Sequence, residues 1–225
     1  MKAVVFILAR KNSTRLKKKN HLKIKNISLV ERAIRFAYSL KYVNKIILST
    51  DDTFQFSKSY EPKLIIVKRP KSLSGSKSRS EDAILHAIIK LKLDLKSKNF
   101  PIILLQPTSP FRSKVLIFKA YKKILNNLNS NYSIISVSKS LRKNTTRLFV
   151  DSKGKLVKKK SLKNKNSISC TPNGNFYLAK LNFFKKNRSF FKEKNSIPFF
   201  INNNKLKIDI DTKKDFLLAK SFELR

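Results

Sequence analysis

An alternation of short apolar runs with longer amphipathic segments constrains the fold more than any other feature. The apolar runs occupy residues 3–8, 45–49, 64–67, 101–105 and 132–137. Polar residues bound each run. Continuous apolar runs of this length are typical of strands that are buried on both faces of a sheet. The sequence therefore predicts five strands in a mainly parallel sheet.

Helical patterns separate these expected strands. Ser28 is followed three residues later by Glu31, a capping-box pattern that predicts a helix from residue 28 to about residue 40. Further helices are expected at residues 53–60, from Ser80 to about residue 95, and at residues 113–128. Repeated strand–helix–strand units place helices on both faces of the sheet, so we expect a three-layer α/β/α fold.

The pattern changes after residue 137. Residues 148–150 and 155–157 flank a glycine turn at 151–154, so we expect a β-hairpin followed by an exposed loop up to about residue 168. The remaining expected elements are strands at 175–178, 198–201 and 206–210 and a last helix at 212–222. With 225 residues, 41% of them apolar, the chain can form one large domain, which we assign to residues 1–225.

The net charge of +39 allows two interpretations. A strongly basic chain is often a nucleic-acid-binding protein. However, lysine is spread almost everywhere in this chain, including the expected helix faces and hairpin turns, together with abundant Asn, Ile and Phe. Such a profile also fits a coding bias toward A and T. We favour the bias and expect no specific nucleic-acid partner, but an RNA-binding protein stays open as an alternative.

Cysteine content and apolar runs bear on the compartment. Cys170 is the single cysteine, so neither an intramolecular disulfide nor a zinc cluster is expected. The N-terminal apolar run is short and ends at Arg10 without a small-residue cleavage site, which favours a strand over a signal peptide. No stretch approaches the roughly 20 apolar residues of a membrane span. We expect a soluble cytoplasmic protein without a membrane partner.

The loop after the first expected strand carries an unusual density of cations. It contains Asn12, Ser13 and Thr14, and its cations are Arg10, Lys11, Arg15, Lys17, Lys18 and Lys19. Ligands of open parallel sheets bind at the carboxyl ends of the strands, where this loop lies. The loop lacks the glycines of a Walker or dinucleotide-binding motif. It could still bind a polyphosphate through charge-assisted hydrogen bonds, or be a solvated lysine turn.

The segment LLQPTSPFR, residues 104–112, follows a buried strand directly. Pro107 and Pro110 fix φ and remove backbone donors, which stiffens the turn. A stiff turn at the carboxyl end of a strand suits a site that presents Gln106 and hydroxyl groups to a ligand. The alternative is an ordinary proline-rich turn.

The segment IDIDT, residues 208–212, places two carboxylates side by side. On a strand, residues i and i+2 point to one face, so Asp209 and Asp211 project together while Ile208 and Ile210 face the core. Paired carboxylates repel unless a cation lies between them, and Mg²⁺ is typically held by one or two carboxylates plus substrate phosphates. Alternatively, Asp211 caps the last helix and Asp209 pairs with a lysine.

The segment TPNGNFYLA, residues 171–179, contains a tight-turn signal at Asn173-Gly174 that leads into an expected strand. Asn173 or Tyr177 could contact a ligand, and an ordinary hairpin turn is equally compatible with the residues.

Taken in order, these segments resemble the acylneuraminate cytidylyltransferases (CMP-sialic acid synthetases), including their legionaminate and pseudaminate relatives. The matching blocks are ILARKNSTRLKKKN, LSTD, RPKSLS, LLQPTSPFR, PNGNFY and IDIDTKKDF, which together cover essentially the whole chain. LQPTSP with a later DID is specific. The proline usual in the family's opening loop is missing, and Gly75-Ser-Lys-Ser78 stands where an aspartate is usual.

The resemblance implies a Rossmann-like nucleotidyltransferase fold and a set of site residues. Arg10, Lys19 and Asp211 would be catalytic, and Asp209 and Asp211 would hold Mg²⁺. The residues implied to bind CTP are Asn12, Ser13, Asn20 and Ser80, and those implied to bind the sugar are Arg69, Gln106, Asn173 and Tyr177. A β-hairpin arm within about residues 139–172 would form a homodimer.

The implied reaction transfers CMP from CTP to the anomeric hydroxyl of a nine-carbon 2-keto-3-deoxy sugar acid and releases pyrophosphate. The alternative within enzymes is a cytidylyltransferase for the eight-carbon 3-deoxy-octulosonate. The LQPTSP segment argues against that alternative.

Overall fold

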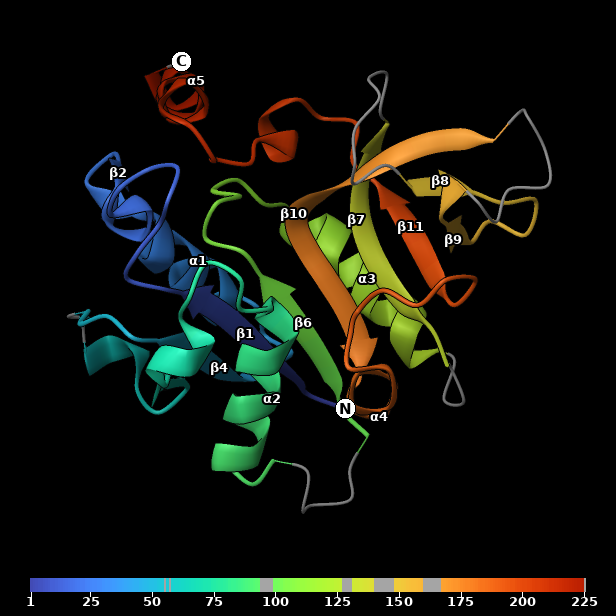
Figure 1. The fold of residues 1–225 in the computed structure, drawn as a ribbon, viewed down its shortest axis with the longest axis horizontal. Helices are drawn as coiled ribbons and strands as arrows, with labels where there is room; N and C mark the ends of the chain where they lie inside the picture. The colour runs from blue at the N-terminus through green and yellow to red at the C-terminus, as the bar shows by residue number, and fades with distance from the viewer. Residues whose placement is uncertain are drawn as a thin grey trace.

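In the described part of the chain, a nine-stranded mixed sheet forms the centre of the molecule (Figure 1). The structure is a computed structural model and describes residues 1–54, 56, 58–93, 99–126, 131–139, 148–159 and 167–224. The strands of the sheet are β1 (Ala3–Ala9), β4 (Val43–Thr50), β5 (Leu64–Lys68), β6 (Pro101–Leu105), β7 (Ser133–Lys139), β8 (Leu148–Val150), β9 (Leu156–Val157), β10 (Ile168–Lys180) and β11 (Ser196–Phe200). The strand order is β11-β7-β10-β6-β1-β4-β5; β8 pairs with β10 off this path, and β9 pairs with β8.

Parallel pairs predominate along this order, as the sequence predicts. β1 is parallel to β4 and β6, so that Val5 lies between Ile46 and Ile103. β4 and β5 are parallel, and so are β7 and β11. β10 runs antiparallel to both β6 and β7 and makes the sheet mixed. A separate two-stranded sheet joins β2 (Lys23–Ile24) to β3 (Ile27–Ser28).

Helices cover both faces of the sheet, which confirms the three-layer α/β/α fold. α1 (Leu29–Tyr38) and α3 (Lys114–Leu125) pack on one face, and α2 (Ser80–Lys90) and α4 (Leu181–Asn187) pack on the other (Figure 1). β1 divides its side chains between the two cores: Val5 and Ile7 face α1 and α3, while Val4 and Phe6 face α2 and α4. Burying each such side chain contributes roughly 1.5–3 kcal/mol. α5 (Lys213–Leu224) lies away from the sheet.

Serine side chains cap the starts of α1 and α3, and the end of α2 differs from expectation. The backbone N–H of Glu31 donates to Ser28 Oγ at 3.1 Å, so the predicted cap of α1 is confirmed. Ser113 caps α3 in the same way. α2 ends at Lys90, earlier than expected, because Lys92 has a φ of +50° that a helix cannot continue. The expected ends of α2 and α3, at residues 95 and 128, lie outside the described residues.

The helix expected at residues 53–60 is wrong apart from the short 3-10 helix η2 (Lys58–Tyr60). Side-chain hydrogen bonds hold the chain in another conformation, since the N–H of Asp52 donates to Thr50 Oγ1 and the N–H of Thr53 donates to Asp52 Oδ1. Such local bonds compete with helix formation. Residues 55 and 57 lie outside the described part of the chain.

The strand expected at residues 206–210 is also wrong. The 3-10 helix η5 (Lys205–Lys207) occupies its start. The extended segment that follows is joined to the turn after β6 by one backbone bond, from the N–H of Ile210 to the carbonyl of Thr108 at 2.8 Å. The expected alternation of side chains nevertheless holds, because Ile208 and Ile210 are buried.

The expected turn at Asn173-Gly174 is instead an irregularity inside β10. The register of β10 against β7 shifts between Pro172 and Tyr177, and Gly174 has a φ of +72°. The predicted hairpin is confirmed as β8 and β9, which pair Phe149 with Val157 and add to the outer end of β10. The exposed loop expected before residue 168 falls largely on residues 160–166, outside the described ranges.

Within the described ranges, no helix combines the length and apolar content that a membrane span requires.

Candidate functional site

A cleft of about 450 Å³ opens at the carboxyl ends of β1 and β6. It joins the cationic loop near the N-terminus to the aspartate segment near the C-terminus. The charged side chains that line it are Arg10, Arg15, Lys19, Arg69, Arg79, Asp209 and Asp211. Cations therefore outnumber carboxylates by five to two, and the site favours an anionic ligand.

Hydrogen bonds to the main chain shape the opening loop. Arg10 Nη1 donates to the carbonyl of Gly75 at 2.9 Å, and Asn20 Nδ2 donates to the carbonyl of Arg10 at 2.8 Å. Lys18 has a φ of +50°, which turns the chain into the 3-10 helix η1 (Lys19–His21). These contacts bend the loop back over the cleft and direct Lys19 into it.

Arg69 is fixed at the floor of the cleft. Its Nε donates to Ser49 Oγ at 3.1 Å and its Nη2 to the carbonyl of Ser49 at 2.7 Å. Burial lowers the pKa of Arg69, and the nearby charge of Asp51 opposes that shift. The two hydrogen bonds to Ser49 hold the guanidinium in place in the cleft lining.

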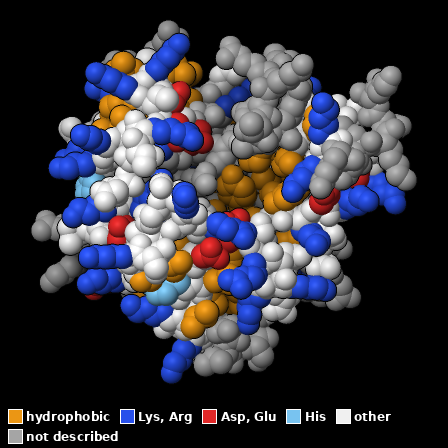
Figure 2. All heavy atoms as spheres, viewed as in Figure 1, with side chains coloured by type: hydrophobic (Ala, Val, Ile, Leu, Met, Phe, Trp, Pro, Cys, Tyr) orange, Lys and Arg blue, Asp and Glu red, His pale blue; other side chains and the backbone are white. Residues whose placement is uncertain are grey.

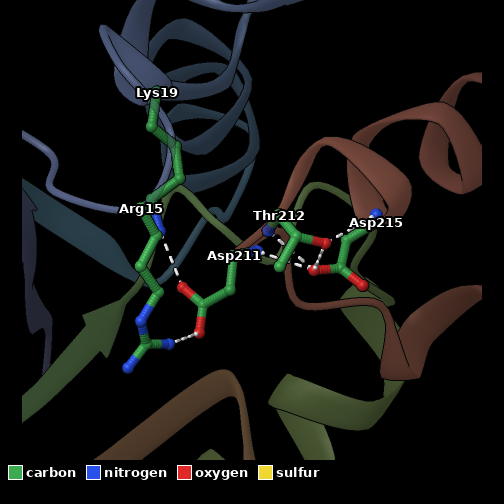
Figure 3. Close-up of polar contacts among 5 residues, drawn as sticks. All are labelled: Arg15, Lys19, Asp211, Thr212 and Asp215. Carbon is green, nitrogen blue, oxygen red and sulfur yellow. Dashed lines mark hydrogen bonds and ion pairs between the residues drawn. The ribbon is translucent and has the colours of Figure 1, made fainter.

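Asp211 binds two cations of the opening loop. Arg15 Nη1 lies 2.6 Å from Oδ2, and Lys19 Nζ lies 2.7 Å from Oδ1 (Figure 3). On the other side, Asp215 Oδ2 accepts hydrogen bonds from the N–H groups of Asp211 and Thr212. The N–H of Asp215 donates to Thr212 Oγ1, so Thr212 and Asp215 cap α5. The alternative in which Asp211 caps this helix is therefore wrong.

Asp209 differs from its neighbour because it makes no ion pair within the described residues, although the charge of Lys19 still acts on it. Its Oδ1 is buried and has no hydrogen-bond partner among the described residues, which also contain no ion pair of Asp209 within 4.0 Å. The expected alternative, a salt bridge from Asp209 to a lysine, is thus not observed within those residues. Burial raises the pKa of Asp209, a hydrogen bond with Thr108 opposes the shift, and the charge of Asp211 adds to it.

Two carboxylates with one orphaned oxygen fit a hard divalent cation. Oxygen ligands are those that Mg²⁺ prefers, and it commonly takes one or two carboxylates and completes its shell with phosphates and water. In the described part of the chain, no group of three or more His, Cys, Asp or Glu side chains could hold a metal. Asp209 and Asp211 would supply two carboxylates to such an ion.

Gly174 of β10 approaches the cleft from behind. A β-carbon at this position would lie 2.5 Å from Gln106 Oε1 and 2.8 Å from Ser109 Oγ. Only glycine lets β10 come this close with a positive φ. The lack of a side chain at residue 174 leaves room for the Gln106 side chain, which lines the cleft.

Nine of the sequence-predicted site residues line the cleft: Arg10, Ser13, Lys19, Asn20, Arg69, Ser80, Gln106, Asp209 and Asp211. Asn12, Asn173 and Tyr177 are not among the lining residues. Asn173 is buried and donates to Ser138 Oγ, and Tyr177 packs against Phe190, with burial raising the pKa of its hydroxyl. The ligand roles of all these residues remain predictions.

The cleft also contains residues that the sequence did not single out as site residues, among them Ser76, Ser78, Arg79 and Thr108. Three of them lie between the 3-10 helix η3 (Lys71–Leu73) and α2. Their signal in the sequence is the run of hydroxyl residues and cations that precedes the start of α2.

A doubly covered α/β sheet with a cationic cleft at the carboxyl ends of its strands is the architecture of the doubly wound α/β proteins, which bind their ligands at that edge. The comparison with family models is more specific: the model described as Cytidylyltransferase matches residues 4–223. The chain belongs to this cytidylyltransferase family, and it is therefore a nucleotidyltransferase.

Curated relatives match over nearly the whole chain. The N-acylneuraminate cytidylyltransferase of Escherichia coli O18:K1:H7 is 29% identical over 97% of this chain and 51% of its own length. The chain thus spans about half the length of that relative. The CMP-N,N'-diacetyllegionaminic acid synthase of Legionella pneumophila is 28% identical over 98% of this chain and 95% of its own length.

Solved structures support the fold. A CMP:2-keto-3-deoxy-manno-octonic acid synthetase complexed with CTP has a TM-score of 0.73 at 14% identity, covering 100% of this chain and 99% of the other. A 4-diphosphocytidyl-2C-methyl-D-erythritol synthase from Anaerococcus prevotii has a TM-score of 0.57 at 16% identity, with the same coverage. The fold is therefore the one expected for a nucleotidyltransferase.

Proposed function

We propose that the protein transfers CMP from CTP to the anomeric hydroxyl of a nine-carbon 2-keto-3-deoxy sugar acid and releases pyrophosphate in a Mg²⁺-dependent reaction. Membership of the cytidylyltransferase family supports the nucleotide, and the two acidic-sugar relatives support the acceptor. The observation that carries the proposal is the single cleft in which the cationic loop and the paired aspartates meet.

The cationic loop suits the triphosphate of CTP. Arg10 and Lys19 line the cleft beside Ser13, Asn20 and Ser80, so charged and neutral donors converge on one cavity. When the sugar hydroxyl attacks the α-phosphate, negative charge grows on the departing pyrophosphate. Fixed cations stabilise this charge without reorganising, which lowers the barrier. We assign that role to Arg10 and Lys19. Asn12 belongs to the same loop but does not line the cleft, and we propose that it also contributes to nucleotide binding.

Asp209 and Asp211 would hold the magnesium ion. When bound, Mg²⁺ supplies positive charge that polarises a phosphoryl oxygen and aligns the reacting groups. The protein's own contribution is to bring Asp209, whose Oδ1 has no hydrogen-bond partner among the described residues, and Asp211 into the lining of one cleft.

Arg69 and Gln106 form the part of the cleft that we assign to the sugar acid. A fixed guanidinium is a strong partner for a carboxylate, and an amide can both donate to and accept from sugar hydroxyls. Asn173 and Tyr177 belong to β10 and do not line the cleft, so we assign them an indirect part in sugar binding. We further propose a homodimer formed through residues 139–172, and a cytoplasmic location because CTP is the substrate.

A pyrophosphate-release assay tests the proposal. Purified protein with Mg²⁺ and CTP is supplied in turn with sialic, legionaminic, pseudaminic and 3-deoxy-octulosonic acids, and ATP, GTP and UTP serve as controls. We expect CTP-specific release with a nine-carbon acid. Asp211→Ala should abolish turnover while the circular dichroism spectrum is retained, and Lys19→Ala should raise the KM for CTP. Turnover only with the eight-carbon acid would redirect the proposal to that sugar.

The RNA-binding alternative makes a different prediction. It requires salt-sensitive binding to unrelated RNA and no pyrophosphate release. Lys and Arg side chains are dispersed over the visible face of the molecule rather than gathered into one band (Figure 2), which does not favour a nucleic-acid track. The paired aspartates would also repel a phosphate backbone.

A further inference from the structure

The carboxylate of Asp211 is shared by two cations that come from the opposite end of the chain. Arg15 engages one oxygen and Lys19 engages the other, at 2.6 and 2.7 Å (Figure 3). We call these three residues the Asp211 clamp. The Lys19 side chain is 14% exposed and that of Arg15 is 70% exposed, so solvent screens the Arg15 pair more strongly.

Under the proposed function, on which this inference rests, the same groups are needed by two ligands. A divalent cation requires the oxygens of Asp211, which the clamp already engages. A triphosphate requires Arg15 and Lys19, which the clamp already neutralises. Either ligand alone must therefore break ion pairs and leave one half of the clamp without its partner, whereas both ligands together satisfy both halves.

We propose that the Asp211 clamp couples metal binding to nucleotide binding, so that the cleft binds a divalent cation and CTP together in preference to either one alone. Coupling between two binding sites is reciprocal: if the metal ion strengthens nucleotide binding by some factor, the nucleotide strengthens metal binding by the same factor. The clamp supplies the differential contacts that such coupling requires.

The surroundings of Asp211 allow its side chain to exchange partners while its main chain stays in place. Asp215 accepts hydrogen bonds from the N–H groups of Asp211 and Thr212 at 3.1 and 2.8 Å, which anchors the main chain to the start of α5. Asp209 makes no ion pair within the described residues, so only Asp211 of the two carboxylates has to be released.

The first test measures the binding of Mn²⁺ to the protein alone, followed by electron paramagnetic resonance. Arg15→Gln frees one oxygen of Asp211, and we expect Mn²⁺ to bind roughly two- to fivefold more tightly, the range that exposed ion pairs allow. Lys19→Gln should give a larger increase because its ion pair is better shielded.

Arg79→Gln is the matched control. Arg79 lines the same cleft and is similarly exposed, at 59%, but it lies 3.8 Å from Glu81 instead of contacting Asp211. Removing any positive charge from the cleft helps a cation to bind. The contribution of the Asp211 clamp is therefore the amount by which Arg15→Gln raises the Mn²⁺ affinity more than Arg79→Gln does.

The second test measures CTP binding by calorimetry in the presence of EDTA. Asp211→Asn frees Arg15 and Lys19, so metal-free CTP should bind several-fold more tightly than to the wild type, whereas Mn²⁺ binding should be lost. Asp209→Asn removes a carboxylate from the same cleft that makes no ion pair with either cation, and it should have the smaller effect on CTP.

Equal effects of Arg15→Gln and Arg79→Gln on Mn²⁺ affinity would overturn the coupling, as would weaker metal-free CTP binding by Asp211→Asn. Failure of the proposed function has a different signature, because the wild type would then release no pyrophosphate from CTP with any acid of the panel. A wild type that turns over CTP while its variants show no coupling would contradict the clamp alone.

Discussion

Gly174 combines a left-handed backbone conformation with close contact to Gln106, a residue that lines the cleft. The φ of Gly174 is +72°, and a β-carbon there would lie only 2.5 Å from Gln106 Oε1 and 2.8 Å from Ser109 Oγ. Gly174→Ala should destabilise the protein by roughly 1–3 kcal/mol, the range for a strained left-handed residue, and displace Gln106. We expect the KM for the sugar to rise, as measured by pyrophosphate release, together with a lower Tm.

Gly154→Ala is a control for this prediction. Gly154 also has a positive φ, of +70°, but a β-carbon there would meet nothing within 4 Å. This variant should show the conformational cost alone and keep the wild-type KM. If both variants retained the wild-type KM, the contact between Gly174 and Gln106 would not matter for the substrate.

Asp209 gives a prediction about pH. Burial raises its pKa in the folded protein above that of an ordinary aspartate, so the folded state favours the protonated form. The protonated Asp209 therefore contributes its full stabilisation below the ordinary aspartate pKa of about 3.9. This stabilisation is lost as the pH rises through the raised pKa of the folded state. Asp209→Asn, which stays neutral, should have a higher Tm than the wild type at pH 7 and lose this advantage near pH 4.

Asp211→Asn provides the contrast in the same thermal scans. This substitution breaks the ion pairs with Arg15 and Lys19, so it should not raise the Tm at pH 7. A lower Tm for Asp209→Asn at pH 7 would contradict an unfavourable buried charge at Asp209.

Side-chain alternation and residue type allowed part of the site to be predicted from the sequence. Asp209 and Asp211 were expected on one face, and they line one cleft although their segment forms no strand. In contrast, the ion pairs of Asp211 connect residues 192 and 196 positions apart. Such partners depend on how the whole chain packs, and no local pattern specifies them.

At the scale of elements, strands were predicted best because buried parallel strands leave continuous apolar runs. β6 begins at Pro101 and ends at Leu105, as expected. Helix ends were predicted less well, since a left-handed residue such as Lys92 has no sequence signal beyond its identity. The strand expected at 206–210 failed because a strand needs a partner, and the segment makes one backbone bond to the Thr108 turn.

The cap of α1 gives a prediction for an element. Ser28→Ala removes the acceptor for the N–H of Glu31 and should cost about 1 kcal/mol, or a fall of roughly 2–4 °C in Tm. The KM for CTP should not change, because Ser28 does not line the cleft. Ser113→Ala is a graded comparison: its cap bond to Leu116 is longer, at 3.4 Å, so the loss of stability should be smaller.

At the scale of the whole molecule, the two main cores share strands and should not unfold separately. Val5 and Ile7 of β1 belong to one core, and Val4 and Phe6 belong to the other. We therefore expect residues 1–225 to unfold in one transition, with coincident melting curves from circular dichroism and tyrosine fluorescence. Two separated transitions would show that the chain contains more than one domain.

The pairing of β10 predicts how the protein tolerates insertions and deletions within this strand. This strand of 13 residues pairs with β8 at one end and with β6 at the other, and its irregular part lies between Pro172 and Tyr177. Successive strand side chains point to opposite faces, so gaining or losing a single residue in this interval would turn every later side chain to the wrong face. Deletions and insertions here should be tolerated far less than substitutions, and the number of residues in this interval is itself a structural requirement.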